Sequence, residues 1–415
     1  MKTPFDLPPS KLPHIGTTIF SEMSALARKH GALNVSQGFP DFAPPAPLVE
    51  AVARHMRSGA AANQYAPMAG HLVLREWIAE DMAHRFGAVY DPESEVTIGA
   101  GASSLIFAAI QAWVGEDDEV ILMEPAYDLY APAVRLAGGV IRRVERRTED
   151  DGIDFDALRT VLDRRTRLVI LNSPHNPTGA CMSPGDLEAL YQVMATSHAI
   201  LLSDEVYGPI VHDDRPVTSV AAHPQLAQRS LIAQSFGKVL HATGWKVGSL
   251  VGPSALMEEV RKVHQYDVFS TAGPLQLGIA EFLNTSDGQA HLADLSRFYS
   301  AKRDRLLTGL QGTAWQFKPA EGGYFQTLSY KSFLKAPDGD ACRGWTRDPA
   351  ILLATIPVSA FYDPRHAMRS ASTRIRICFA KGDDTLDQAI ERLRWIAEHP
   401  EAAAHAAQPE AHAEG

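Results

Sequence analysis

The chain has 415 residues, of which 39 are Lys or Arg and 49 are Asp or Glu, so its formal net charge is −10. This acidic balance argues against nucleic-acid binding, which needs a basic face, and against an anionic membrane surface as a partner. Hydrophobic residues make up 45% of the chain. A chain of this length can bury a large core, which we expect to be divided over two or three domains.

Three features predict a cytoplasmic protein without membrane contact. The cysteines Cys181, Cys342 and Cys378 are scattered and form no CxxC motif, which indicates a reducing compartment. The first residues, MKTPFDLPPSKLPH, lack the apolar stretch of a signal peptide. No run of 18 apolar residues is present, so we expect no transmembrane helix.

The predicted elements begin with a Pro-rich arm at 1–15, a helix at 16–30 and a turn-rich stretch at 36–47. From 48 to 300, short apolar runs alternate with helical stretches, and this pattern predicts an α/β domain with a mostly parallel sheet flanked by helices. The helical stretches are 103–114, 126–137 and 185–197, and the strand-like runs are EVTIGA, EVILM, RLVIL, AILLS, SLIAQS and GSLVG.

The pattern changes after residue 300. A helix at 301–312, the strand-like segments GGYFQTLSY and TRIRICFA, and an amphipathic helix at 385–398 predict a smaller α+β domain over 301–399. We expect the N-terminal segment 1–47 to form part of this smaller domain. The Ala-rich residues 400–415 have the low complexity of a frayed or disordered tail.

The segment 235–252, SFGKVLHATGWKVGSLVG, carries two lysines after a strand-like run. A lysine amine forms a Schiff base with an aldehyde cofactor if burial or a nearby cation lowers its pKa. Lys238 is the candidate for this bond. Lys246 would supply the cation and, with Ser235, hold a phosphate. The alternative is that both lysines lie on a surface loop.

Two motifs directly follow other strand-like runs, where an open α/β sheet binds its ligand. In NSPHNPTG the X-Pro steps favour a rigid loop, and Asn176 could offer its amide to a ring oxygen; the alternative is a purely structural turn. In SDEVY, Asp204 is either a helix N-cap or a carboxylate that pairs with a protonated pyridine nitrogen. Tyr207 could donate to the phenolic oxygen of the same ring.

A Gly-rich turn, TIGAGASS, lies between a strand-like run and a helix. The backbone N–H groups of Gly101, Ala102 and Ser103 suit a phosphate there. The turn also half-matches a dinucleotide fingerprint, with Glu124 as the ribose-binding acid, but the third glycine is missing. A nicotinamide-dependent oxidoreductase is therefore an alternative, although it leaves SFGK, HNPTG and SDEVY unexplained.

Taken together and in this order, SFGK, GWKVG, HNPTG, SDEVY and GAGAS resemble the fold-type I aminotransferases of class I and II, which bind pyridoxal 5'-phosphate. GTTIFSEMSALA, SQGFPDF, NQYAPMAG, KVHQY and IRICFAK are similar to the methionine and kynurenine aminotransferase branch. The resemblance spans about residues 14 to 398. It implies a homodimer with shared active sites and no metal.

The resemblance also implies a role for each matching residue around the cofactor. Lys238 would hold the cofactor as a Schiff base and later carry the proton, while Asp204 would pair with the pyridine nitrogen. Tyr127 would stack on the ring; the alternative is a core aromatic. Further cofactor contacts would come from Asn176 and Tyr207 at the phenolic oxygen, from Gly101, Ala102, Ser103, Ser235 and Lys246 at the phosphate, and from Tyr65 at the phosphate of the neighbouring subunit.

The implied substrate site centres on Arg376, which would grip the α-carboxylate together with Asn176 and the backbone of Gly38. Without the resemblance, Arg376 would be interpreted as an exposed strand residue. Family members specific for dicarboxylates use an additional Arg from the neighbouring subunit, and residues 262–296 contain none. Phe20 and Phe269 instead suggest an apolar side-chain pocket, unless they simply pack in the core.

These expectations favour a transaminase that moves the amino group of an apolar, sulfur-containing or aromatic L-amino acid to a 2-oxo acid by a ping-pong mechanism. A cysteine-conjugate β-lyase shares the same cofactor site and is the nearest alternative. A regulator that only senses the cofactor is a further alternative, but this acidic chain offers no spare DNA-binding module.

Overall fold

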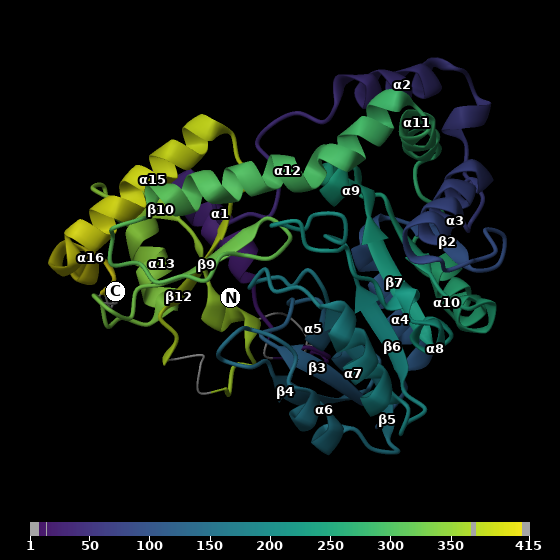
Figure 1. Cartoon of the computed structure of the whole chain (residues 1–415), viewed down its shortest axis with the longest axis horizontal. Coiled ribbons are helices and arrows are strands. Elements are labelled where there is room, and N and C mark those ends of the chain that lie inside the picture. The colour runs from purple at the N-terminus through teal and green to yellow at the C-terminus, as the bar shows by residue number, and fades with distance from the viewer. Residues whose placement is uncertain (1–7, 14, 367–370, 409–415) are drawn as a thin grey trace.

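The computed structural model describes residues 8–13, 15–366 and 371–408. Figure 1 shows a larger part built around a twisted sheet and a smaller part that contains the C-terminal helices. The large sheet has seven strands in the order β2-β8-β7-β6-β5-β3-β4. Their bounds are β2 Val96–Gly99, β3 Glu119–Glu124, β4 Val140–Glu145, β5 Thr166–Asn172, β6 Ile200–Asp204, β7 Ser230–Ser235 and β8 Gly248–Val251.

Strands β3 to β7 run parallel, whereas β8 is antiparallel to both of its neighbours. The central strands β5 and β6 are almost continuously apolar because both of their faces are covered. In the register of this pair, Asn172 lies opposite Asp204. The HNPTG and SDEVY motifs therefore begin side by side at the carboxyl edge of the sheet.

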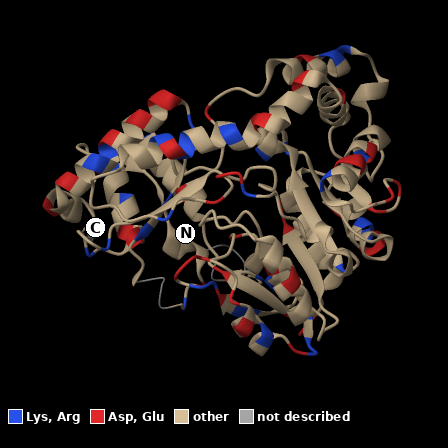
Figure 2. Cartoon of the chain, viewed as in Figure 1, with Lys and Arg blue, Asp and Glu red and all other residues tan. Residues whose placement is uncertain are grey.

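Helices flank the large sheet (Figure 1), and charged residues of both signs are interspersed over helices and loops (Figure 2). Among the described residues, none of the helices has the length and apolarity needed to cross a bilayer. The helices of this part are α2 Ala46–Arg57, α3 Leu72–Phe86, α4 Gly101–Trp113, α5 Tyr130–Leu136, α6 Phe155–Val161, α7 Pro184–Met194, α8 Pro224–Ala227, α9 Phe236–Val239, α10 Ser254–Asp267 and α11 Gly273–Leu283, with the 3-10 turns η1 Ala61–Asn63, η2 Val220–Ala222 and η3 Thr243–Trp245.

The smaller part joins the two ends of the chain. The two-residue strands β1 and β10 pair in parallel, and a separate antiparallel sheet has the order β11-β12-β9. Its elements are α1 Ile19–His30, β1 Leu33–Asn34, β9 Phe325–Ser329, α13 Asp338–Arg347, β10 Leu353–Ala354, β11 Ile356–Pro357, η4 Val358–Phe361, β12 Arg374–Cys378, α15 Asp383–Glu398 and α16 Pro400–Ala406.

One long helix, α12 (Ser286–Gly309), runs from the larger part to the smaller part (Figure 1). It begins at the N-cap Thr285, whose side chain accepts a hydrogen bond from the Gly288 N–H. The domain boundary that we place after residue 300 lies inside this helix. The division of the chain into domains therefore stays a prediction.

The Ala-rich end of the chain differs from its prediction. Residues 400–406 form α16, in which Ala403 is fully buried, and Ala407 beyond it is 3% exposed. The carbonyl of Ala403 accepts a hydrogen bond of 3.1 Å from the indole N–H of Trp345. Frayed structure is thus wrong for residues 400–408, because small side chains let this helix pack closely on α13. Residues 409–415, like residues 1–7 of the arm, lie outside the described residues.

The other predicted elements are confirmed apart from their ends. Each of the six strand-like runs of the large domain overlaps a strand, from β2 to β8. The prediction missed β4, whose sequence VIRRVE carries two arginines. This strand lies at the edge of the sheet and is largely accessible to water, so its sequence lacks a continuous apolar run.

Candidate active site

A cavity of about 150 Å³ lies at the carboxyl edge of the large sheet. Its wall comes from the start of α4, the ends of β5, β6 and β7, and the turn after α9. Every residue expected to contact the cofactor within one chain lines this cavity, namely Gly101, Ala102, Ser103, Tyr127, Asn176, Asp204, Tyr207, Ser235, Lys238 and Lys246.

Lys238 lies on α9, and its ammonium group points into a poorly solvated space. Burial lowers the pKa of this group to about 8, and the positive charge of Lys246 acts in the same direction. Lys238 Nζ donates a hydrogen bond of 3.3 Å to the carbonyl of Gly38 and lies 5.7 Å from the centre of the Tyr207 ring. At neutral pH a larger fraction of this amine is unprotonated than for an ordinary lysine, which is what a nucleophilic amine needs.

Asp204 is the last residue of β6 and is 4% exposed. Its Oδ2 accepts a hydrogen bond of 2.6 Å from the Tyr130 hydroxyl, and burial raises the pKa of the carboxyl to about 6. A turn, not a helix, follows this residue, so the N-cap interpretation of Asp204 is wrong. A buried carboxylate in a cavity has the charge that a protonated ring nitrogen requires.

The opposite end of the cavity is complementary to a phosphate. The N-cap of α4, Ala100, makes no side-chain cap, and Gly101 has a φ of +76°, a backbone conformation that side chains disfavour. A Cβ on Gly101 would lie 3.1 Å from Lys246 Nζ, and a Cβ on Gly248 would lie 2.4 Å from the Ala102 nitrogen. Lys246 is exposed, as a loop residue would be, yet its ammonium reaches this turn.

The donor set at this end is thus a lysine ammonium, two serine hydroxyls and the first N–H groups of α4, which together fit a phosphate dianion. The dinucleotide alternative fits less well. Glu124 is buried, and its Oε1 accepts hydrogen bonds from Arg143 Nε at 2.9 Å and from the Asp363 N–H at 3.0 Å. It is therefore a structural carboxylate that is engaged away from the cavity, not a ribose ligand.

Arg376 is 1% exposed, which overturns its interpretation as an exposed strand residue. Its Nη1 donates to Asn176 Oδ1 at 2.7 Å and its Nη2 donates to the Ser36 carbonyl at 2.6 Å, while its Nε has no partner. Burial lowers the pKa of the guanidinium to about 10, so it remains charged at neutral pH. Three phenylalanine rings surround it, with centres at 4.0 Å for Phe325, 5.1 Å for Phe20 and 5.3 Å for Phe361.

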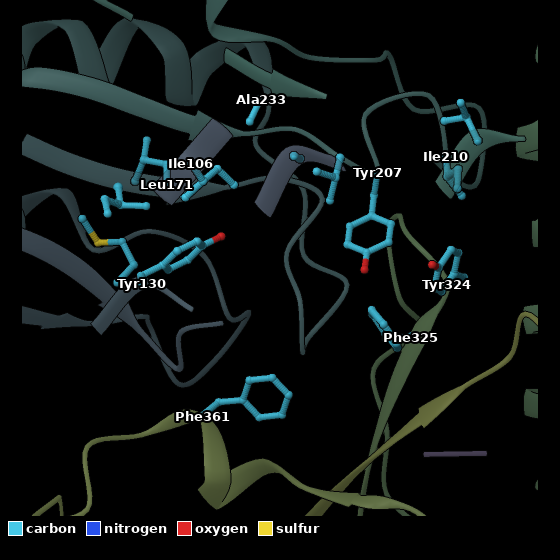
Figure 3. Packing of buried hydrophobic residues seen from close by; sticks show 14 of the residues in the cluster. Ile106, Tyr130, Leu171, Tyr207, Ile210, Ala233, Tyr324, Phe325 and Phe361 are labelled. Atoms are coloured by element: carbon cyan, nitrogen blue, oxygen red, sulfur yellow. The ribbon is translucent and has the colours of Figure 1, made fainter. Parts of the chain in front are cut away.

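Gly38 lies in the turn that precedes α2, two residues after Ser36, and its carbonyl accepts the hydrogen bond from Lys238. Its carbonyl also accepts a hydrogen bond of 2.9 Å from the Tyr324 hydroxyl. A Cβ on Gly38 would lie 2.7 Å from the Phe325 ring, so the backbone approaches the site more closely than any other residue type would allow without a shift. Figure 3 shows the Tyr207 ring projecting toward Phe325.

Five of the predicted residues do not line this cavity: Arg376, Gly38 and Phe20 form the neighbouring group described above, whereas Tyr65 and Phe269 lie at the surface. Tyr65 is 85% exposed and Phe269 is 44% exposed, and their rings pack edge-to-face on each other with centres 5.6 Å apart. Phe20, in contrast, packs against Arg376 and Phe361 as described above. The structure of one chain therefore does not place Tyr65 and Phe269 in the candidate site.

Some residues of the site were not predicted. Tyr130 binds Asp204, and Asn172 joins two motifs because its Nδ2 donates to the Asp204 carbonyl at 2.8 Å and its Oδ1 accepts from the Asn176 N–H at 2.7 Å. Phe325 and Phe361 were also missed. The position of Asn172 in the sequence could have indicated its role. Asn172 comes at the end of one strand-like run, and Asp204 comes at the end of the next strand-like run along the chain.

The carboxyl edge of this sheet carries a lysine with a lowered pKa, a buried carboxylate and a turn that suits a phosphate. This combination is typical of α/β enzymes that bind pyridoxal phosphate. Comparison with known proteins specifies the family. The family model of aminotransferases of class I and II matches residues 31–393. The chain belongs to this family, whose members use pyridoxal phosphate to move amino groups between amino acids and 2-oxo acids.

Relatives of the branch named by the resemblance are among the matches. The methionine aminotransferase of Escherichia coli is 44% identical over 94% of this chain and 98% of its own length. A kynurenine–oxoglutarate transaminase of Dictyostelium discoideum is 31% identical over 93% of this chain and 95% of its own length. The crystal structure of a methionine aminotransferase from Escherichia coli superposes with a TM-score of 0.88 at 43% identity, covering 94% of this chain and 99% of that one. The resemblance to this branch is confirmed.

Proposed function

We propose that this transaminase acts on apolar, sulfur-containing or aromatic L-amino acids, in particular methionine-like or kynurenine-like donors. The observation that carries the proposal is the surroundings of Arg376. A guanidinium with an unpartnered Nε can bind an α-carboxylate, while Phe20, Phe325 and Phe361 enclose it with apolar surface that favours an apolar side chain. The likeness to a methionine aminotransferase at 44% identity supports the same substrate class.

The residues of the cavity and the neighbouring Arg376 and Gly38 then have separate tasks. Arg376 and the backbone of Gly38 hold the α-carboxylate, and Asn176 orients Arg376 through its 2.7 Å hydrogen bond. Pyridoxal phosphate, when bound, supplies an electron sink for the electrons of the substrate Cα–H bond. Lys238 Nζ, with a pKa of about 8, takes the proton from Cα. Asp204 balances the positive charge of a ring nitrogen, while Ser103, Ser235 and Lys246 hold the phosphate.

The enzyme is also proposed to work as a homodimer in the cytoplasm. Three aromatic side chains are exposed on the surface of the chain, with exposed fractions of 85% for Tyr65, 87% for Tyr266 and 44% for Phe269. Burial of this aromatic surface between two copies of the chain would be favourable. Tyr65 would reach the phosphate in the second subunit, and Phe269 would border its substrate pocket. The three cysteines are free, which suits a reducing compartment.

The test is a panel of amino donors offered to the purified enzyme with several 2-oxo acids, with every product measured. Methionine, phenylalanine and kynurenine should each yield a new amino acid, whereas aspartate and glutamate should be poor donors. A preference for the dicarboxylates would overturn the proposed substrate class. Pyruvate and ammonia released from a cysteine conjugate, with no new amino acid, would indicate a β-lyase instead.

Lys238→Ala tests the central role directly. This variant should lose nearly all turnover, and borohydride should no longer trap the cofactor on the protein, because no other described lysine combines a place in the cavity with a pKa lowered to about 8. Normal transamination by Lys238→Ala would overturn the assignment of the lysine.

A further inference from the structure

The helix that carries Lys238 is a single turn, and its position depends on contacts from outside. α9 has four residues, and its carbonyls accept hydrogen bonds from the chain that follows, at 2.9 Å from the Leu240 N–H to Phe236 and at 3.0 Å from the Ala242 N–H to Gly237. The last carbonyls of a helix have no partner within it. One of them, the carbonyl of Val239, lies 2.8 Å from His291 Nε2 of α12. This hydrogen bond fixes the peptide group between Val239 and Leu240, one residue beyond Lys238.

A second histidine strengthens the same contact. His241 adopts a left-handed backbone conformation with a φ of +56°, which turns its side chain back toward α12. Its ring stacks on Phe298 at 5.4 Å and meets His291 edge-on at 5.0 Å. Its Nε2 is buried without a partner, and burial lowers the pKa of the ring to about 4, so His241 is a neutral aromatic group at neutral pH.

The same face of α12 contacts the segment that carries Gly38. Phe42 packs edge-on against His241 at 4.8 Å and against Phe298 at 5.3 Å. The ammonium of Lys302 lies over both phenylalanine rings, at 5.0 Å from Phe42 and 4.9 Å from Phe298, and donates to the Lys381 carbonyl at 2.7 Å. One helix therefore contacts the turn after Lys238 and the segment whose Gly38 carbonyl accepts the Lys238 amine.

We propose that His291 and His241 are positioning residues for Lys238: through them, α12 sets the direction from which the lysine amine enters the cavity. The inference rests on the proposed function for its catalytic consequence. Neither histidine touches the cavity, so each would act through the backbone of residues 239–241. A small displacement of a reacting amine is costly, since a misplacement of about 1 Å can cost about a hundredfold in rate.

The test compares His291→Gln, whose amide can still donate to the Val239 carbonyl, with His291→Leu, which fills similar space without a donor. Arg297→Ala serves as a control on the same helix, because Arg297 is exposed and forms an ion pair with Asp294 only at the surface. The first readout uses protein freed of cofactor: Lys238 is modified with an amine-selective reagent across a pH series, and mass spectrometry follows the modified peptide. The second is kcat and KM for the amino donor.

In His291→Leu we expect kcat to fall about tenfold to a hundredfold with KM little changed, because Arg376 is untouched. The midpoint of Lys238 modification should move upward, since an amine that leaves its desolvated position regains an ordinary pKa. His291→Gln and Arg297→Ala should match the unmodified protein in both readouts. Unchanged kcat and an unchanged Lys238 midpoint in His291→Leu would overturn the proposal.

Should His291→Leu fail to fold, His241→Phe and His241→Ala decide the matter. Phenylalanine preserves the stacking on Phe298 and should preserve the Lys238 midpoint, whereas alanine should shift it upward. Equal midpoints in the two variants would overturn the proposal. Because these measurements use protein without cofactor, they stand even if the unmodified enzyme proves not to transaminate, which would refute the proposed function alone.

Discussion

The sequence reveals more about the surroundings of Lys238 than about those of Asp204. The pattern SFGK followed by a second lysine predicted a lowered pKa from burial or a nearby cation, and the structure shows both effects with burial the larger. The side chain that binds Asp204 could not be predicted from the sequence in the same way. Tyr130 is 74 residues away from Asp204 in the chain, and a tyrosine in an amphipathic helix carries no local signal that it will bind a carboxylate.

Replacing Lys246 should change the titration of Lys238. In Lys246→Gln the positive charge beside the amine is lost, so the pKa of Lys238 should rise above about 8, and affinity for the phosphorylated cofactor should fall. Lys246→Arg keeps the charge and should retain the lowered pKa. The pH dependence of Lys238 modification in cofactor-free protein measures the first effect, and titration with pyridoxal phosphate and then with unphosphorylated pyridoxal measures the second. A lower Lys238 pKa in Lys246→Gln would contradict this account.

Asp204 should make the cofactor-free protein less stable as pH rises. Its pKa is raised from 3.8 to about 6 on folding, so the folded state holds the proton more tightly than the unfolded state does. The free energy of unfolding should therefore fall between pH 4 and pH 6, by up to about 3 kcal/mol for this group. In Asp204→Asn this pH-dependent part of the free energy of unfolding should be absent, because the amide does not titrate.

Urea unfolding of both proteins across this pH range measures the difference. Other buried carboxylates, such as Asp338 with a pKa raised to about 6, are present in both proteins and cancel in the comparison. Parallel pH profiles for the two proteins would show that the Asp204 carboxyl is not perturbed by folding.

At the scale of the element, burial on both faces decided which strands could be predicted. β5 and β6 are apolar runs that end in functional residues, and their parallel register placed Asn172 beside Asp204. The edge strand β4 was missed because water covers much of it. The helix α16 was mistaken for a tail because its alanines gain their stability from Trp345 on α13, a long-range partner that no local pattern reveals.

The approach of α4 to β8 should depend on Gly248. In Gly248→Ala the new Cβ would meet backbone atoms at 2.4 to 2.8 Å, so the start of α4 must move away from the strand. We expect a loss of about 1–3 kcal/mol in the free energy of unfolding, together with weaker binding of pyridoxal phosphate. Gly244→Ala is a matched control in the preceding turn, since nothing lies within 4 Å of its Cβ position. Equal stability and cofactor affinity in the two variants would show that this close contact does not matter.

At the scale of the whole molecule, the site is assembled by segments from both ends of the chain around a sheet from its middle. The class of fold followed from alternating strands and helices, and the gathering of the predicted residues around one cavity followed from where the motifs sit on those strands. The pairing of β1 with β10 did not follow, because two-residue strands leave almost no pattern to detect.

Subunit sharing can be tested by mixing two impaired proteins. Lys238→Ala lacks the amine proposed to be essential, and Tyr65→Ala lacks the side chain proposed to reach the second site. In a hybrid dimer, one of the two sites would combine an intact Lys238 with an intact Tyr65. Activity should therefore rise when the two proteins are unfolded together and refolded, compared with each refolded alone. No gain despite formation of hybrid dimers, as shown by mass spectrometry, would contradict a shared site.

The hydrogen bond from Arg376 to the Ser36 carbonyl spans 340 positions of the chain, so the arginine proposed to hold the amino acid is encoded close to the end of the sequence. Every residue that lines the cofactor cavity lies between positions 101 and 246. A polypeptide that stops before residue 376 therefore contains the whole lining of the cavity but lacks the guanidinium proposed for the substrate.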